Sequence, residues 1–328
     1  RVEFILPMTQ LDTDLDLDGG TFSVGGNCSF TQNSGGNDFD IFIDEDAVMT
    51  VGGDLTCTNN GGDDFEFSMG VNGASTASVT VTGHASFIQN NSGSGATWYH
   101  EIYQDCRLTV GQDLTYTTNF TASPLFLVDV QNTAEISVDG DCNLNAAGSG
   151  ELEIRLQNTT FFRIGGNFVR DAAPNNFGEL DCTSGTPTVE YMGSSNTQLI
   201  AEDAGGGGDS FYYYNLEVDN SFGTSPQLSM EGLATVHGDL TMNDGVVLST
   251  AADPLVVDDN ATTSNASDAS HVEGYHRKVG NDAFTFPCGH DGFYAPLGIT
   301  APGSATDQFE CRYFNDMPHD AGYDSSAH

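Results

Sequence analysis

Three aspartates near the beginning of the chain have the spacing of a calcium-binding loop. Asp14, Asp16 and Asp18 alternate with other residues and precede a glycine pair, which is how a loop that binds Ca²⁺ through carboxylate oxygens begins. The twelfth position counted from Asp14 is Gly25, however, where such a loop carries a bidentate Glu. Residues 11–17 also alternate in the manner of a β-strand that leads into a Gly-Gly turn. We favour the strand and keep Ca²⁺ binding as the alternative.

A second pair of aspartates, Asp113 and Asp141, occupies one position of a phrase that recurs along the chain. Stacked copies of this phrase would lie ~4.8 Å apart, where two carboxylates repel each other by ~0.9 kcal/mol in water. A bridging Ca²⁺ would relieve this repulsion. The interpretation that we favour is an exposed turn, in which each carboxylate accepts hydrogen bonds from local backbone N–H groups.

Aromatic residues offer a different kind of site. Trp98, Tyr99 and Tyr103 lie close together in the sequence, and exposed aromatic rings can stack on the apolar faces of sugars. These three residues therefore predict a glycan-stacking platform in a lectin-like, carbohydrate-binding module. This function is the alternative to a structural one.

Motifs for nucleophilic catalysis or phosphate binding do not occur in the sequence. There is neither a Gly-x-Ser-x-Gly elbow nor a phosphate loop, and the 8 His do not stand at metal-ligand spacing. We expect His271, His276 and His290 to lie at the surface. The sequence therefore predicts that the chain is not an enzyme.

A polysaccharide lyase is the least favoured function. Lyase chemistry needs a basic residue beside a calcium–carboxylate cluster. The repeated part of the chain contains no Lys and offers only Arg107, Arg155, Arg163 and Arg170. We expect Arg163 and Arg170, which flank one phrase, to pair with nearby carboxylates, and the negative charge would repel a polyuronate.

The charge of the chain limits the kinds of partner that it can bind. The 47 Asp and Glu residues against 8 Lys and Arg give a formal net charge of −39. Nucleic acid is excluded as a partner because a polyanion requires a basic surface. Membrane insertion is not expected, because no apolar run approaches the ~20 residues that cross a bilayer. Divalent cations or a salty medium, which screens repulsion, suit such a chain.

One phrase of seven residues repeats and determines the fold that we expect. It has the form Val-Gly-Gly-Asp-Leu-Thr-x, with apolar residues before and after the glycines alternating with polar ones. The residues that begin each copy are Val24, Val51, Val81, Val110, Val138, Ile164 and Val236. The first six begin copies 26 to 30 residues apart. The glycine two residues after the lead fits a corner with positive φ or a close backbone approach.

This period, with strand alternation and without helical spacing, is typical of a β-solenoid. A second inward strand precedes each phrase, with Ile43, Ile102, Val130 and Leu156 eight residues before their lead residues. We therefore predict an all-β fold: a right-handed parallel β-helix over residues 1–265, followed over 270–328 by a β-sandwich-like and incomplete region. The handedness follows the rule for parallel crossovers.

The second half of the chain resembles a known group of proteins. Residues 188–193 read TVEYMG, residues 211–220 read FYYYNLEVDN, and residues 286–289 read FPCG. These phrases are similar to those of very large, repeat-rich surface proteins of Bacteroidota, which type IX secretion exports and which act as adhesins. The resemblance covers about residues 185–328 and includes cell-surface appendages such as grappling-hook proteins. It implies an extracellular, adhesive role, although the C-terminal sorting domain of that group is not present.

The 7 Cys are scattered, without a Cys-x-x-Cys motif, and an odd number leaves at least one thiol unpaired within the chain. We expect them to be mainly core residues. Cys28 and Cys142 share a column but should lie four coils apart, beyond the reach of a disulfide. The pair Cys288 and Cys311 stays open.

Together these patterns predict a structural and adhesive module of a large secreted protein or extracellular appendage. It would act as a stiff rod and assembly element at the cell surface. The expected partners are further copies of the chain, neighbouring subunits of a filament, or cell-surface glycans. No cofactor is required, and Ca²⁺ is the candidate ion.

Overall fold

The computed structural model of the chain describes residues 2–5, 13–33, 38–61, 64–71, 73–90, 97–120, 125–148, 151–170, 177–202 and 211–314. It contains two compact units. The N-terminal unit comprises residues 1–188 and 205–211, and the C-terminal unit comprises residues 189–204 and 212–328. The described residues include no helix that is long and apolar enough to cross a membrane.

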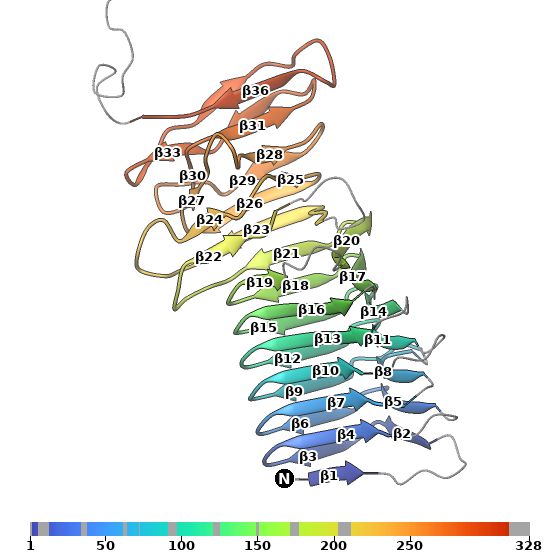
Figure 1. Cartoon of the computed structure of the whole chain (residues 1–328). Coiled ribbons are helices and arrows are strands. Elements are labelled where there is room, and N and C mark those ends of the chain that lie inside the picture. Colours follow the sequence, from blue (N-terminus) through green and yellow to red (C-terminus); the bar gives the residue numbers. More distant parts are fainter. Residues whose placement is uncertain are drawn as a thin grey trace, which may run out of the picture. The chain divides into compact units, whose positions relative to one another are not determined.

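The strands of the N-terminal unit are stacked in sequence order in three parallel sheets (Figure 1). Sheet A contains β1 (Val2–Ile5), β4 (Cys28–Gln32), β7 (Leu55–Asn59), β10 (Ala85–Gln89), β13 (Leu114–Phe120), β16 (Cys142–Gly148) and β19 (Phe168–Arg170). Sheet B contains β2 (Thr13–Asp18), β5 (Phe39–Asp44), β8 (Phe65–Met69), β11 (Trp98–Ile102), β14 (Leu125–Val130), β17 (Glu151–Asn158) and β20 (Phe177–Gly185). Sheet C of this unit contains β3 (Thr21–Val24), β6 (Val48–Val51), β9 (Ser78–Val81), β12 (Arg107–Val110), β15 (Glu135–Val138) and β18 (Phe161–Ile164).

The register of sheet C confirms the repeat. Val24 faces Val51, which faces Val81, and the column continues through the remaining lead residues to Ile164 without a shift. The lead side chains are buried, whereas the polar residue directly before each of them in its strand points outward. The prediction of an all-β solenoid with stacked parallel strands is therefore confirmed.

Sheet B contributes the aromatic part of the core. The rings of Phe39, Phe65, Trp98 and Phe126 follow one another up the sheet, with centroids 5.2, 4.2 and 5.0 Å apart. Stacked and edge-to-face pairs at these distances add to the stability that burial supplies. Each coil covers the apolar face of its neighbour, as the solenoid requires.

The C-terminal unit continues the parallel pairing in shorter strands. One sheet contains β22 (Gln198–Ile200), β24 (Leu228–Met230), β27 (Val247–Leu248), β30 (Val272–Glu273), β33 (Cys288–His290) and β34 (Phe293–Tyr294). A second contains β25 (Ala234–Val236), β28 (Leu255–Val257), β31 (His276–Val279) and β36 (Gln308–Cys311). Three further strands, β23 (Asn215–Asp219), β26 (Asp239–Asp244) and β29 (Thr262–Ser264), pair in parallel, whereas β32 (Phe284–Phe286) pairs with β35 (Leu297–Ile299). β21 (Thr188–Tyr191) lies at the boundary of the two units.

Antiparallel strand pairs occur at the end of the described part of this unit. Parallel pairs extend to β30 with β33, and β31 with β36, β32 with β35 and β33 with β34 are antiparallel. The antiparallel strands lie within the predicted sandwich-like region of residues 270–328, of which residues 315–328 are outside the described part. The domain limits at 265 and 270 stay predictions.

Two of the three histidines expected at the surface are buried. His271 and His276 are fully buried, and His290 is half-buried. His276 lies on β31 between the rings of Phe284 and Phe286, with centroids 5.9 and 5.6 Å away. The expectation of solvation was wrong because the alternation of β31 turns His276 inward.

Candidate functional site

Sheet B carries many carboxylates on the side opposite to the core, interrupted by other side chains such as Phe42 and Leu127. Side chains alternate along a strand, and the parallel register places carboxylates of successive strands above one another. These residues, here called the acidic face, are Asp14, Asp16, Asp18, Asp40, Glu66, Glu101, Asp129, Glu153, Glu179 and Asp181. Tyr99 lies in the same column as Glu66. The structure thus brings three of the five predicted calcium ligands, Asp14, Asp16 and Asp18, and part of the predicted glycan platform onto one surface.

A cavity of about 210 Å³ lies beside the first strands of this face. Asp16, Asp18, Asp44 and Glu45 line it together with residues 73–75. Burial raises the pKa of Asp16, and the neighbouring carboxylates of Asp18 and Asp44 raise it further. Hard cations such as Ca²⁺ bind several carboxylate oxygens at once, so the cavity has the donor atoms that this ion prefers. Sequence reasoning missed Asp44 and Glu45, which reach the cavity from the next coil.

The three predicted aspartates form a strand and not a calcium loop. They belong to β2, which ends at Asp18 and is followed by Gly19 and Gly20 with φ of 71° and 80°. The strand interpretation is therefore confirmed. Asp14 does not line the cavity but faces Asp40 of the neighbouring strand.

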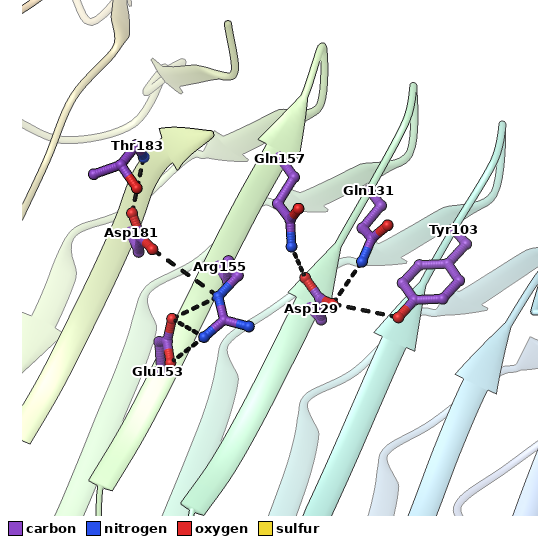
Figure 2. Close-up of polar contacts among 8 residues, drawn as sticks. All are labelled: Tyr103, Asp129, Gln131, Glu153, Arg155, Gln157, Asp181 and Thr183. Carbon is purple, nitrogen blue, oxygen red and sulfur yellow. Dashed lines mark hydrogen bonds and ion pairs between the residues drawn. The ribbon is translucent and has the colours of Figure 1, made fainter. Parts of the chain in front are cut away.

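Asp129 is the centre of a hydrogen-bond network on the acidic face (Figure 2). Its Oδ2 accepts a hydrogen bond from Gln131 Nε2 at 2.7 Å, and its Oδ1 accepts one from Gln157 Nε2 at 2.8 Å. The Tyr103 hydroxyl lies 3.3 Å from Asp129 Oδ2 and donates to Glu101 at 2.8 Å. Burial raises the pKa values of Glu101 and Tyr103, and the hydrogen bond to Glu101 raises that of Tyr103 further. The network binds neighbouring coils to one another through polar side chains.

Arg155 holds the next part of the acidic face together (Figure 2). Its guanidinium donates to both carboxylate oxygens of Glu153, at 2.8 and 2.9 Å, and its Nε lies 4.0 Å from Asp181 Oδ2. Burial raises the pKa of Glu153, and the adjacent Arg155 opposes this rise. The Thr183 N–H donates to the other oxygen of Asp181 at 2.8 Å. Arg155 thus neutralises part of a crowded acidic surface.

The other arginines of the repeated region also have structural contacts. Glu135 accepts Arg107 Nη2 at 2.8 Å and Arg163 Nη1 at 2.6 Å, so one carboxylate joins three coils. Arg170 lies over the ring of Phe211 at 4.4 Å. The expected pairing with an acid is confirmed for Arg163, and Arg107 and Arg155 pair with acids as well. These contacts engage the guanidinium groups that lyase chemistry would require.

The predicted glycan platform does not exist as proposed, because Trp98 is inside the core. Its exposed fraction is 0%, and its indole stacks between Phe65 and Phe126 at 4.2 and 5.0 Å. Tyr99 and Tyr103 are half-buried and point to the opposite side of the strand. Side chains alternate between the two sides of β11, so Trp98, four residues before the inward Ile102, also points into the core.

Asp113 and Asp141 belong to a ladder at the corner between sheets C and A. The ladder comprises Asn27, Asp54, His84, Asp113, Asp141 and Asn167. Asp113 Oδ1 accepts the N–H of Asp141 at 2.9 Å, and Asp141 Oδ1 accepts the N–H of Asn167 at 2.7 Å. The favoured interpretation is therefore right about backbone donors, but each donor belongs to the next coil and is not local. Parallel stacking causes this, because it places the N–H of each coil over the side chain of the coil before.

The same ladder explains the glycines of the repeated phrase. A Cβ atom at Gly140 would overlap Asp113 Oδ1, and one at Gly166 would overlap Asp141 Oδ1. Neither glycine has a positive φ, so close approach is the reason for glycine here. Gln112 is the exception in this column, and the ladder residue of the preceding coil is His84, which has no Oδ atom. The ladder side chain of one coil thus determines whether the next coil needs glycine at this position.

We expect Gly140→Ala to destabilise the N-terminal unit by about 1–3 kcal/mol, the usual cost of overpacking a close contact. The added methyl group would also lie 2.8 Å from the backbone carbonyl carbon of Gln112, so the backbone must shift. Gly25→Ala is the matched control, because nothing lies within 4 Å of its Cβ position. Urea unfolding of the two variants measures the difference, and equal stability would contradict the ladder.

One group that sequence reasoning missed is Glu273, His290 and Asp291. Their ligand atoms lie within 4.8 Å of one another. His290 is 3.7 Å from Glu273 and 3.4 Å from Asp291. Its two ring nitrogens thus form ordinary ion pairs with the two carboxylates when His290 is protonated. Because Glu273 and His290 are on strands adjacent in space and 17 residues apart in sequence, no local spacing could reveal the group.

Comparison of the chain with known protein families, with curated proteins and with solved structures finds no match. The resemblance to large surface proteins therefore stays a prediction from a few phrases.

Proposed function

We propose that the chain is a structural and adhesive module of an extracellular protein, serving as a stiff rod and assembly element. The observation that carries this proposal is the unshifted column from Val24 to Ile164 in sheet C. Sheet A is in equally regular register. A parallel ladder of this kind resists bending because every coil is hydrogen-bonded and packed to its neighbours. The polar ladders and arginine bridges add contacts between coils on the outside.

The charge and the acidic face support a position outside the cell. A net charge of −39 keeps chains soluble and apart at low salt, and its repulsion is screened in a saline medium. Localisation at the surface is tested by treating intact producing cells with a protease. We expect loss of an antibody epitope on the chain from intact cells, whereas protection until the cells are lysed would contradict the proposal.

Assembly with a second copy is supported by apolar side chains at the last described strands. Phe293, Leu297 and Phe309 are 56%, 52% and 37% exposed. They lie on β34, β35 and β36, each of which is the last strand of its sheet among the described residues. Free strand edges that carry apolar side chains are sites of strand addition. We assign the exposed apolar side chains on β34, β35 and β36 to contact with another copy of the chain.

Light scattering of the intact protein tests the assembly. We expect oligomers whose size rises with concentration, and we expect Leu297→Asp to reduce the mass to that of the monomer. Leu248→Asp is the control, because Leu248 is 38% exposed but lies on β27, inside its sheet. A monodisperse monomer at high concentration, with or without a chelator, would refute assembly and leave only the rod.

Calcium binding is tested separately, and the cavity is the better position for it. Asp113 Oδ1 already accepts the N–H of Asp141, so this carboxylate has only one oxygen left for an ion. We expect Ca²⁺ to raise the unfolding temperature of the N-terminal unit, and Asp16→Asn with Asp18→Asn to remove most of this rise. Asp113→Asn, which keeps the acceptor of the ladder, should retain it. Equal responses of all three proteins would disprove a site in the cavity.

A further inference from the structure

The thiols of Cys288 and Cys311 meet in the C-terminal unit. Their Sγ atoms are 2.8 Å apart, and the side chains are 0% and 7% exposed. Cys288 lies on β33, which pairs in parallel with β30, whereas Cys311 lies on β36, which pairs antiparallel with β31. The two sulfurs therefore connect two different sheets at the point where the parallel coils give way to antiparallel strands.

We propose that Cys288 and Cys311 form a redox-active pair that a small disulfide, such as oxidised glutathione, converts into an intramolecular disulfide. The sulfurs need to approach by less than about 1 Å to reach a bond of about 2.05 Å. Disulfides persist in oxidising surroundings such as the outside of a cell. The bond would fasten β36, an edge strand, to the last parallel coil.

The two thiols have different roles in the exchange. The hydrogen bond from Cys288 lowers the pKa of Cys311, whereas donating that bond, together with burial, raises the pKa of Cys288. Cys311 is also the more exposed thiol, so its thiolate attacks the reagent disulfide and releases one glutathione thiolate. Cys288 then loses its proton, attacks Cys311 Sγ and displaces the second glutathione. Two protein thiols are oxidised, one glutathione disulfide is reduced to two glutathione molecules, and no other electron acceptor is needed.

The other cysteines provide a contrast within the same chain. They are Cys28, Cys57, Cys106, Cys142 and Cys182, all buried in the N-terminal unit. Cys28 faces Leu55, and Cys57 faces Phe30, so even these two neighbours occupy different columns. Burial raises the pKa of Cys142 and of Cys57 well above the usual range. We expect all five to stay thiols.

Peptide mapping tests the bond directly on the unaltered protein. The native chain is incubated with oxidised glutathione, then denatured, alkylated with iodoacetamide and digested with trypsin. Cleavage after Lys278 and Arg312 leaves both cysteines in one peptide, residues 279–312. We expect this peptide to be two hydrogens lighter and without alkyl groups, and to gain two alkyl groups after reduction. Alkylation of both cysteines in the oxidised sample would overturn the proposal.

The effect on stability tests the role as a fastening. Closing a loop of this length favours folding by roughly 300-fold in the unfolding equilibrium, on the chain-entropy scale. A reductant should therefore lower the unfolding midpoint of the oxidised wild type, and of Cys142→Ala as the matched control. Cys311→Ser, which keeps a hydrogen-bonding partner for Cys288, should not respond to the reductant. A response of Cys311→Ser equal to that of the wild type would refute the fastening.

Discussion

Val110→Asp is expected to unfold the N-terminal unit around β12. Val110 is fully buried between Val81 and Val138 in the lead column. A carboxylate at this position has no basic partner, and an uncompensated buried charge costs about 3–5 kcal/mol. Domains are stable by only about 5–15 kcal/mol in total. Because a solenoid is stabilised by contacts between neighbouring coils, the coils on both sides should loosen with it.

Circular dichroism and urea titration measure this loss, and Trp98 fluorescence reports on β11, the preceding strand of the same coil. The control is Gln112→Asp, which adds the same charge two residues further on, at an exposed position. We expect the control to unfold within about 0.5 kcal/mol of the wild type, as surface substitutions do. A Val110→Asp protein with wild-type stability would show that the lead column is not part of the core.

Acid should destabilise the C-terminal unit through His276, and His276→Phe should remove this effect. Burial, reinforced by the charge of Lys278, lowers the pKa of His276 from 6.5 to about 3. Between these values the unfolded chain binds a proton that the folded chain does not, so stability falls as the pH decreases from 6.5 and levels off below 3. At pH 4 the loss is about 3 kcal/mol, at 1.36 kcal/mol for each pKa unit.

Phenylalanine is a suitable replacement because neither ring nitrogen of His276 has a hydrogen-bond partner, and its neighbours are Phe284 and Phe286. Urea unfolding at pH 7 and pH 4, followed by circular dichroism, should show a loss smaller by about 3 kcal/mol in the variant. His84→Asn, which removes an exposed imidazole, is the control and should behave as the wild type. The same acid loss in His276→Phe and the wild type would refute this assignment.

The sequence by itself determined the periodic part of this protein. Alternation around Val110 and its equivalents identified which residues face the core, and the period of the phrase identified the solenoid, because both are properties of consecutive residues in a strand. The same alternation could have placed Trp98 inside, since Ile102 was already expected to point inward. The strand nature of Asp14 to Asp18 was likewise visible in the sequence.

Only the tertiary structure decided which residues meet across coils. Asp44 and Glu45 join Asp16 at the cavity, Asp113 accepts its hydrogen bond from Asp141, and Cys311 reaches Cys288. These contacts depend on the register between strands and on where the chain turns back, neither of which changes the local pattern of apolar and polar residues. Gly140 shows what the sequence and the tertiary structure each contribute. Its type was evident in the repeat, but its physical reason, the carboxylate oxygen of the coil before, appears only when the coils are stacked.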